Sequence, residues 1–184
     1  ALSSAASDVY KRQVVLVATV RALKMHGGVP KTDLATPDVE AVKRGIVNLE
    51  KHIENIKQYG LPLVIAINAF AQDTPEELEA IRSHCAAHGV NVALSEVFAK
   101  GGEGGIELAK EVVALATSGK ADFKLLYGEE LSLKEKIETI AKKIYGAVGV
   151  NYTKEANNAL KDFEKMGYGH CLLYTSPSPR DRSV

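Results

Sequence analysis

Continuous apolar runs recur along the middle of the chain. Val14–Val20, VVLVATV, is rich in β-branched residues, as is typical of a strand buried on both faces of a parallel sheet. Leu61–Asn68, LPLVIAIN, has the same character, Asn91–Val97 is a shorter candidate, and Phe123–Tyr127, FKLLY, is another. We therefore predict a strand at each of these places.

The stretches between these runs show the periodicity of helices. From Pro37 to Tyr59, apolar side chains recur at spacings of three and four, which predicts an amphipathic helix with Thr36 as its N-cap. Thr74–Glu77 and Ser132–Glu135 each form a capping box, and Thr153 is the N-cap expected for a last helix. This alternation predicts an α/β layered fold, with a mostly parallel sheet flanked by helices, like an incomplete P-loop NTPase.

The two ends of the chain lack this order. Residues 1–13 show no sustained period, and residues 171–184 contain Pro177 and Pro179, which exclude a regular helix there. We expect residues 1–13 and 171–184 to be disordered or foreign to the protein, and residues 14–170 to form one α/β domain.

Composition narrows the possible partners. The 184 residues are 46% hydrophobic and carry a formal net charge of zero, which gives no electrostatic footprint for nucleic acid or an anionic membrane. The apolar runs are too short to cross a bilayer. Cys85 and Cys171 lie far apart, and Cys85 suits the role of a small buried hydrophobe. The sequence thus predicts a soluble cytoplasmic protein that binds neither nucleic acid nor membrane.

Functional residues are expected just after the strands, because ligands of open parallel sheets bind beyond the carboxyl ends of the strands. Three such corners are Arg21–Gly28, Asn68–Asp73 and Phe98–Gly105. Phe70 and Phe98 can form two walls of a slot for a flat ligand. The alternative is that both rings cap the core, which composition alone favours.

The third corner contains the glycine-rich run GGEGG. It lacks the Gly-Lys-Ser/Thr of a Walker loop and the spacing of a dinucleotide fingerprint. Lys100 and the backbone N–H groups of Gly101, Gly102, Gly104 and Gly105 can hold a carboxylate or phosphate at the start of the next helix. A plain tight turn explains the same glycines equally well.

Two further patterns bear on function. The corner Asn68–Ala71 lacks the lysine and aspartate of the Asn-Lys-x-Asp motif that reads guanine in GTPases, which argues against a guanine site. The charged side chains of one helix face are interpreted as solvent-exposed pairs at spacings i,i+3 and i,i+4; they are Glu50, Lys51, Glu54 and Lys57. No metal site is predicted.

Several long blocks resemble the formate–tetrahydrofolate ligase family. They are VVLVATVRALKMHGGVPK, NLEKHIENI, VIAINAF, ALSEVFAKGGEGGIELA, LSLKEKIETIAKKIYGA and a final GYG, between about Val14 and Gly169. The resemblance implies a ligase of one-carbon metabolism. ATP (with Mg²⁺) and formate would give formyl phosphate, and the N10 amine of tetrahydrofolate would take the formyl group.

The resemblance also assigns residues to the folate site. In this family the folate lies between two aromatic positions that match Phe70 and Phe98, and a leucine matching Leu94 lines the same pocket. The family commonly has tryptophan at Phe98 and proline at Ala71. Phenylalanine keeps a stacking face with less area, which would weaken folate binding by about 1 kcal/mol.

One part of the family pattern is absent. No Gly-x-x-x-x-Gly-Lys-Ser/Thr occurs in the 184 residues. We therefore expect the chain to be an internal fragment of the enzyme that includes the folate-site region. We expect this fragment to be inactive alone and to bind no cofactor firmly. The parent enzyme would use small-molecule substrates and can be a homo-oligomer, and a mitochondrial or plastid location stays open. The alternative function is a noncatalytic nucleotide-binding α/β module.

Overall fold

The computed structural model describes residues 13–173. The terminal segments expected to be disordered or foreign therefore lie, apart from residues 13 and 171–173, outside the described residues. The contacts divide the chain into two compact units, with the boundary between Phe123 and Lys124. Among the described residues, no helix combines the length and apolar character needed to cross a membrane.

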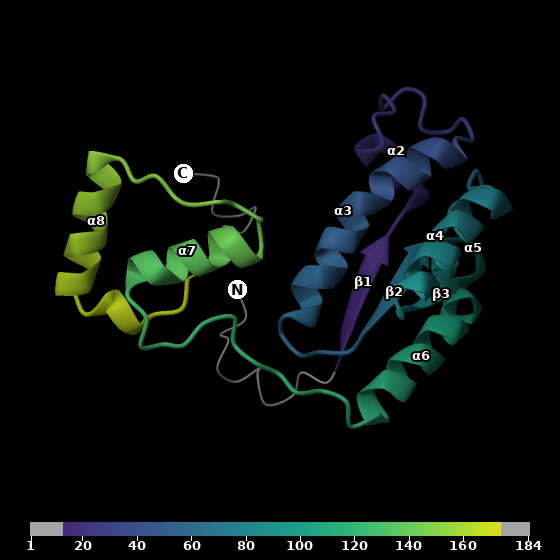
Figure 1. Cartoon of the computed structure of the whole chain (residues 1–184). Helices are drawn as coiled ribbons and strands as arrows, with labels where there is room; N and C mark the ends of the chain where they lie inside the picture. The colour runs from purple at the N-terminus through teal and green to yellow at the C-terminus, as the bar shows by residue number, and fades with distance from the viewer. Residues whose placement is uncertain (1–12, 174–184) are drawn as a thin grey trace. The chain divides into compact units, whose positions relative to one another are not determined.

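The first unit is built on a parallel sheet. Its strands are β1 (Val14–Ala18), β2 (Leu63–Asn68) and β3 (Asn91–Ser95), in the order β1-β2-β3 (Figure 1). Together with the helices that flank it, this sheet confirms the predicted layered α/β fold. The strand predicted at Phe123–Tyr127 is wrong, because these residues form no strand. The Phe123 ring instead stacks on Tyr59, with centroids 6.4 Å apart.

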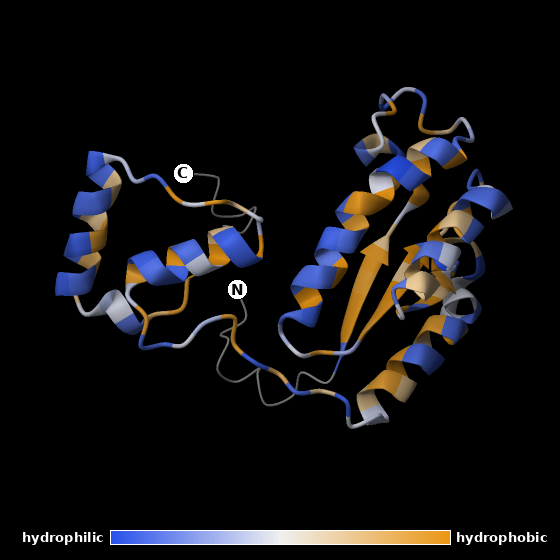
Figure 2. Ribbon diagram, viewed as in Figure 1, coloured by the Kyte–Doolittle hydropathy of each residue, from blue (hydrophilic) through white to orange (hydrophobic). Residues whose placement is uncertain are grey.

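Helices α3 (Val39–Lys57) and α4 (Pro75–Ala87) cover one face of the sheet, and α6 (Ile106–Thr117) lies against β2 and β3 on the other (Figure 1). Figure 2 shows the strands in the colour of hydrophobic residues and α3 with an alternation of both colours, as an amphipathic helix requires. A hydrophobic core fills the space between the sheet and helices α3 and α4. It contains Val42, Ile46, Leu49 and Ile53 of α3, Ile81 and Cys85 of α4, and Leu63, Ile65 and Ile67 of β2.

The predicted small buried hydrophobe at Cys85 is confirmed. Its side chain has no exposed area, and burial raises the pKa of the thiol to about 11. On the opposite face of the sheet the cover is less complete, since Val15 and Val17 of β1 remain exposed.

The first strand ends earlier than predicted. Thr19 accepts a hydrogen bond from the backbone N–H of Ala22 at 3.1 Å and caps helix α2 (Val20–His26), so the expected loop corner is mostly helical. Helix α2 packs closely on α3, because Gly45 leaves room for the backbone carbonyl of Leu23, which a Cβ at this position would strike.

Other helix starts follow the sequence with one exception. Both predicted capping boxes are confirmed, at the start of α4 and at the start of α7 (Leu133–Lys143). Thr153 caps α8 (Lys154–Lys165), as predicted. The prediction of Thr36 as N-cap of α3 is wrong, because Asp38 accepts the capping hydrogen bond from the Ala41 N–H at 2.8 Å.

The second unit contains α7, α8 and a short 3₁₀ helix η2 (Tyr168–His170). Figure 2 draws α7 and α8 largely in the colour of hydrophilic residues. Lys136 of α7 is fully buried and donates to the carbonyl oxygens of Gly169 and Cys171, at 2.7 and 3.3 Å. These bonds hold the segment after α8 against α7.

A buried ion pair joins three helices of the first unit. Nζ of Lys24, on α2, lies 2.9 Å from Oε1 of Glu77, on α4, and their side chains are 1% and 0% exposed. The ammonium also donates to the carbonyl oxygen of Thr36 at 3.0 Å. The Glu77 carboxylate accepts backbone N–H bonds from Asp38 and Thr74, at 2.9 and 3.0 Å.

This network decides the charge state of Glu77. Burial alone would raise the pKa of its carboxyl, but the hydrogen bonds from Thr74, Asp38 and Lys24, with the positive charge of Lys24, lower it overall. The ionised carboxylate is therefore the form that ties the start of α4 to α2 and to the start of α3.

We predict that Glu77→Ala lowers the free energy of unfolding by about 3–5 kcal/mol, because it leaves the Lys24 ammonium buried without a counter-charge. Urea denaturation would measure the loss. Glu54→Ala, which breaks an exposed ion pair with Lys51, serves as the matched control and should cost less than about 1 kcal/mol. The double variant Lys24→Met/Glu77→Ala should recover part of the loss. Equal losses of unfolding free energy in Glu77→Ala and Glu54→Ala would contradict the network.

The lowered pKa of Glu77 also predicts a pH dependence. A carboxyl whose pKa is below its ordinary value of 4.5 in the folded chain contributes stability that is complete above that value. This contribution is lost as the pH falls through the folded-state pKa. The wild-type chain should thus lose more unfolding free energy between pH 7 and pH 3 than Glu77→Gln does. Parallel curves for the two proteins would show that Glu77 is not the titrating group.

Candidate functional site

The carboxyl ends of β2 and β3 lie side by side. Asn68 and Ser95 are register partners at the ends of these parallel strands, and the N–H of Ala69 donates to the carbonyl oxygen of Ser95 at 3.0 Å. The corner that follows Asn68 and the corner that follows Ser95 therefore begin at the same edge of the sheet. This edge is where open parallel sheets bind ligands.

Phe70 lies in the first of these corners and is half-buried. The guanidinium carbon of Arg21, on α2, is 5.2 Å from the centre of its ring, which is a cation–π arrangement. The backbone N–H of Phe70 donates to Oδ2 of Asp73 at 2.8 Å. Helix α2 and the Asp73 turn thus support the position of this ring.

Asp73 is a polar group of this corner to which the sequence assigned no role. Its Oδ1 atom is buried and has no hydrogen-bond partner among the described residues, whereas Oδ2 accepts the Phe70 N–H. Buried carboxylate oxygens are usually hydrogen-bonded, so an unsatisfied one beside a strand end is a candidate acceptor for a ligand. In the sequence, Asp73 is marked only by its place at the end of the predicted corner Asn68–Asp73, three residues after Phe70.

Leu94 and Phe98 occupy different environments after the neighbouring strand. Leu94, in β3 and opposite Ile67 in the register, is partly buried and packs against the hydrophobic core. Phe98 lies on the short helix α5 (Val97–Lys100) and is 87% exposed. Phe98 therefore does not cap the core, and its ring is available to a ligand.

The glycine run forms a 3₁₀ helix, η1 (Gly101–Gly105), between α5 and α6. The Glu96 N–H donates to the carbonyl oxygen of Gly104 at 3.0 Å, which folds the run back onto the end of β3. A Cβ on Gly104 would lie 2.5 Å from the backbone carbonyl of Glu96, so a larger residue does not fit there. Close backbone packing is thus one reason for the glycine at this position.

The candidate anion-binding groups lie around this run. Nζ of Lys100 is 2.6 Å from Oε2 of Glu96 in an exposed ion pair. Gly101 and Gly102 begin η1, and Gly105 precedes α6 without any side-chain cap. A ligand anion at Lys100 would therefore compete with the Glu96 carboxylate.

The chain matches the model of a known protein family. The family model described as formate--tetrahydrofolate ligase matches residues 1–177 of the 184-residue chain. The match includes β2, β3 and the two corners described above.

We predict that Gly104→Ala lowers the free energy of unfolding by about 1–3 kcal/mol, because the added methyl group strikes backbone atoms that cannot rotate away. Gly102→Ala is the matched control, since a Cβ there meets nothing within 4 Å, and it should change stability by less than about 0.5 kcal/mol. Thermal unfolding followed by circular dichroism would compare them. Equal stability of the two variants would refute the close packing at Gly104.

Proposed function

The chain belongs to the formate–tetrahydrofolate ligase family, and we propose that it forms the folate-binding part of an enzyme that joins formate to tetrahydrofolate with ATP. One observation carries this proposal. Adjacent parallel strands each end in a corner with a phenylalanine, and a hydrogen bond from Ala69 to Ser95 joins the two corners. Aromatic rings at one edge of a sheet suit a flat heterocycle such as the pterin ring.

In this proposal Phe70 and Phe98 are the stacking walls of the folate site, and Leu94 is its apolar floor. Phe70 is supported from behind by Arg21, so its ring is already oriented. Phe98 has little contact with the rest of the chain and gains burial when a ligand stacks on it. Stacking of this kind contributes about 1 kcal/mol for each ring.

Polar groups at the same edge would orient the folate. Oδ1 of Asp73, which has no hydrogen-bond partner within residues 13–173, can accept from the amine and ring N–H groups of a pterin. The backbone N–H groups of Gly101, Gly102, Gly104 and Gly105, with Lys100, are proposed to contact the negatively charged end of a substrate. Lys100 would exchange its present contact with Glu96 for this anion.

The proposed reaction has two steps. A carboxylate oxygen of formate attacks the γ-phosphorus of ATP, which forms formyl phosphate and releases ADP. The N10 amine of tetrahydrofolate then attacks the formyl carbon, the bond to the phosphate oxygen breaks, and phosphate leaves as the amine loses a proton. The sequence contains no Walker-type loop, so we assign no contact with ATP or its Mg²⁺ to these residues. We expect the 184-residue chain to bind tetrahydrofolate weakly and without turnover.

We predict that Phe98→Trp binds tetrahydrofolate about fivefold more tightly than wild type, because the indole adds stacking area worth about 1 kcal/mol. Phe98→Ala and Phe70→Ala should each weaken binding by about fivefold or more. Calorimetric titration of the 184-residue chain would measure the dissociation constants, after a cooperative unfolding transition has shown that each variant is folded.

Phe163→Ala is the control for this series. Phe163 lies on α8 and is partly exposed, but it is far in sequence from both corners. Its removal should leave the affinity unchanged. Tetrahydrofolate affinities that are the same in all four variants would refute the folate slot. Binding of ATP or GTP without tetrahydrofolate binding would favour the noncatalytic nucleotide-binding module.

A further inference from the structure

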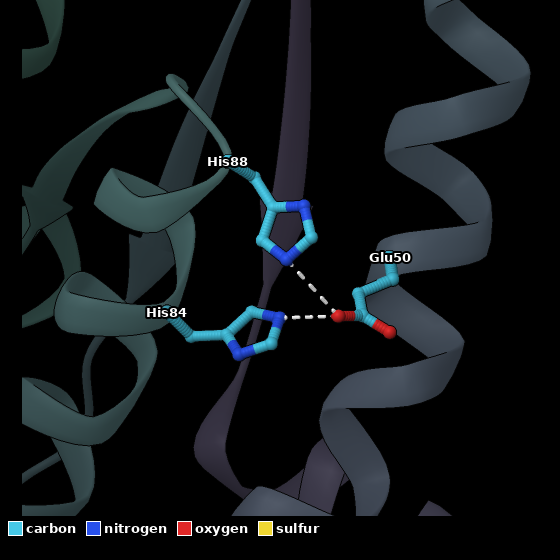
Figure 3. Close-up of side chains that lie close together, drawn as sticks. All are labelled: Glu50, His84 and His88. Atoms are coloured by element: carbon cyan, nitrogen blue, oxygen red, sulfur yellow. Dashed lines mark ion pairs between the residues drawn. The ribbon is translucent and has the colours of Figure 1, made fainter.

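A cluster of metal-binding side chains lies between α3 and α4. Nε2 of His84 and Nε2 of His88 both point toward Oε1 of Glu50, at 2.7 and 3.2 Å (Figure 3). One ligand atom from each of the three residues lies within 4.8 Å of the others. A carboxylate from one helix thus meets two imidazoles from its neighbour.

The backbone fixes this arrangement. His84 and His88 are four residues apart, which places them on one face of α4 and its C-cap, and their ring centroids are 4.8 Å apart. The Nζ atom of Lys57, at the end of α3, donates to the carbonyl oxygen of His88 at 3.1 Å. Next to Glu50 in α3 and to His84 in α4 stand the core residues Leu49 and Cys85, which anchor both helices to the sheet.

Simple ion pairing does not satisfy the cluster. Nε2 of His84 is buried and lies 2.7 Å from Oε1 of Glu50, and it has no hydrogen-bond partner among the described residues. Two imidazole nitrogens also share one carboxylate oxygen. Buried nitrogens without a hydrogen-bond partner are rare in folded proteins, so Nε2 of His84 is a candidate ligand atom.

We propose that Glu50, His84 and His88 bind a divalent transition-metal ion of the Zn²⁺ type. Two imidazoles and a carboxylate form a donor set that Zn²⁺ uses with a fourth position left for water. Mg²⁺ and Ca²⁺ prefer oxygen ligands and are disfavoured by the two nitrogens.

The distances are compatible with such an ion. Metal–ligand bonds of about 2.0–2.2 Å in a tetrahedral site place the ligand atoms about 3.3–3.6 Å apart. The His88–Glu50 contact is already at 3.2 Å, and the 2.7 Å His84–Glu50 contact must open by about 0.6–0.9 Å. All three side chains are partly exposed, and His84 also lines an open groove of ≈ 570 Å³, so water and ions can enter.

The metal would act on stability rather than at the folate corner. Helix α4 begins after β2, at the sheet edge that carries Phe70, and it ends before β3 begins. His84 and His88 therefore lie toward the opposite edge of the sheet from the proposed folate site. A bound ion would join the C-terminal halves of α3 and α4. This inference does not depend on the folate proposal.

Zn²⁺ titration of the EDTA-treated 184-residue chain tests the site. Calorimetry should find one ion per chain, and Co²⁺ should give the visible absorption bands of a site with nitrogen and oxygen ligands. Glu50→Gln, His84→Ala and His88→Ala should each weaken Zn²⁺ binding by more than about tenfold. Zn²⁺ should raise the melting temperature of the wild-type chain and not that of Glu50→Gln.

Two control variants complete the test. His52→Ala removes an exposed histidine two residues from Glu50, and His170→Ala removes one beside the exposed Cys171. Both should bind Zn²⁺ as wild type does. The proposal is overturned if wild type binds no Zn²⁺, or if Glu50→Gln and His88→Ala bind it as tightly as His52→Ala. If His84→Ala does not fold, the other two cluster variants still decide the outcome.

Discussion

The arrangement of the first unit depends on the buried Lys24–Glu77 ion pair. Two charges without exposed surface are stable only when hydrogen bonds satisfy them, and here the partners are the carbonyl oxygen of Thr36 and the N–H groups of Asp38 and Thr74. The pair therefore sets where α3 and α4 begin. It also holds in place α2, the helix whose Arg21 supports Phe70. Core packing and the candidate site are thus connected through one electrostatic network.

Local sequence signals predicted what local interactions determine. The capping boxes of α4 and α7 and the N-cap at Thr153 depend on residues close to one another in sequence, and all were predicted. Strands β2 and β3 were also predicted. The signal was clearest for β2, because both of its faces are buried and its sequence is a continuous apolar run. Sheet order then placed the two corners on one edge, which a parallel α/β fold implies.

The errors arose where tertiary contacts decide. Thr36 looked like an N-cap, but its carbonyl binds the Lys24 ammonium and Asp38 caps the helix instead. FKLLY has a strand composition without forming a strand. Glu50 was interpreted as part of a solvated charged face, because sequence spacing within α3 cannot show that two histidines of α4 lie opposite it. The orientation of the Phe70 and Phe98 rings toward a folate stays a prediction.

The burial of Cys85 has a practical consequence. A thiol with a pKa of about 11 and no exposed surface is almost entirely protonated at neutral pH and inaccessible to electrophiles. Alkylation at this position therefore requires α4 to separate from the sheet. With the exposed Cys171 replaced by serine, the rate of maleimide labelling at Cys85 would measure how often α4 opens locally from the sheet under native conditions.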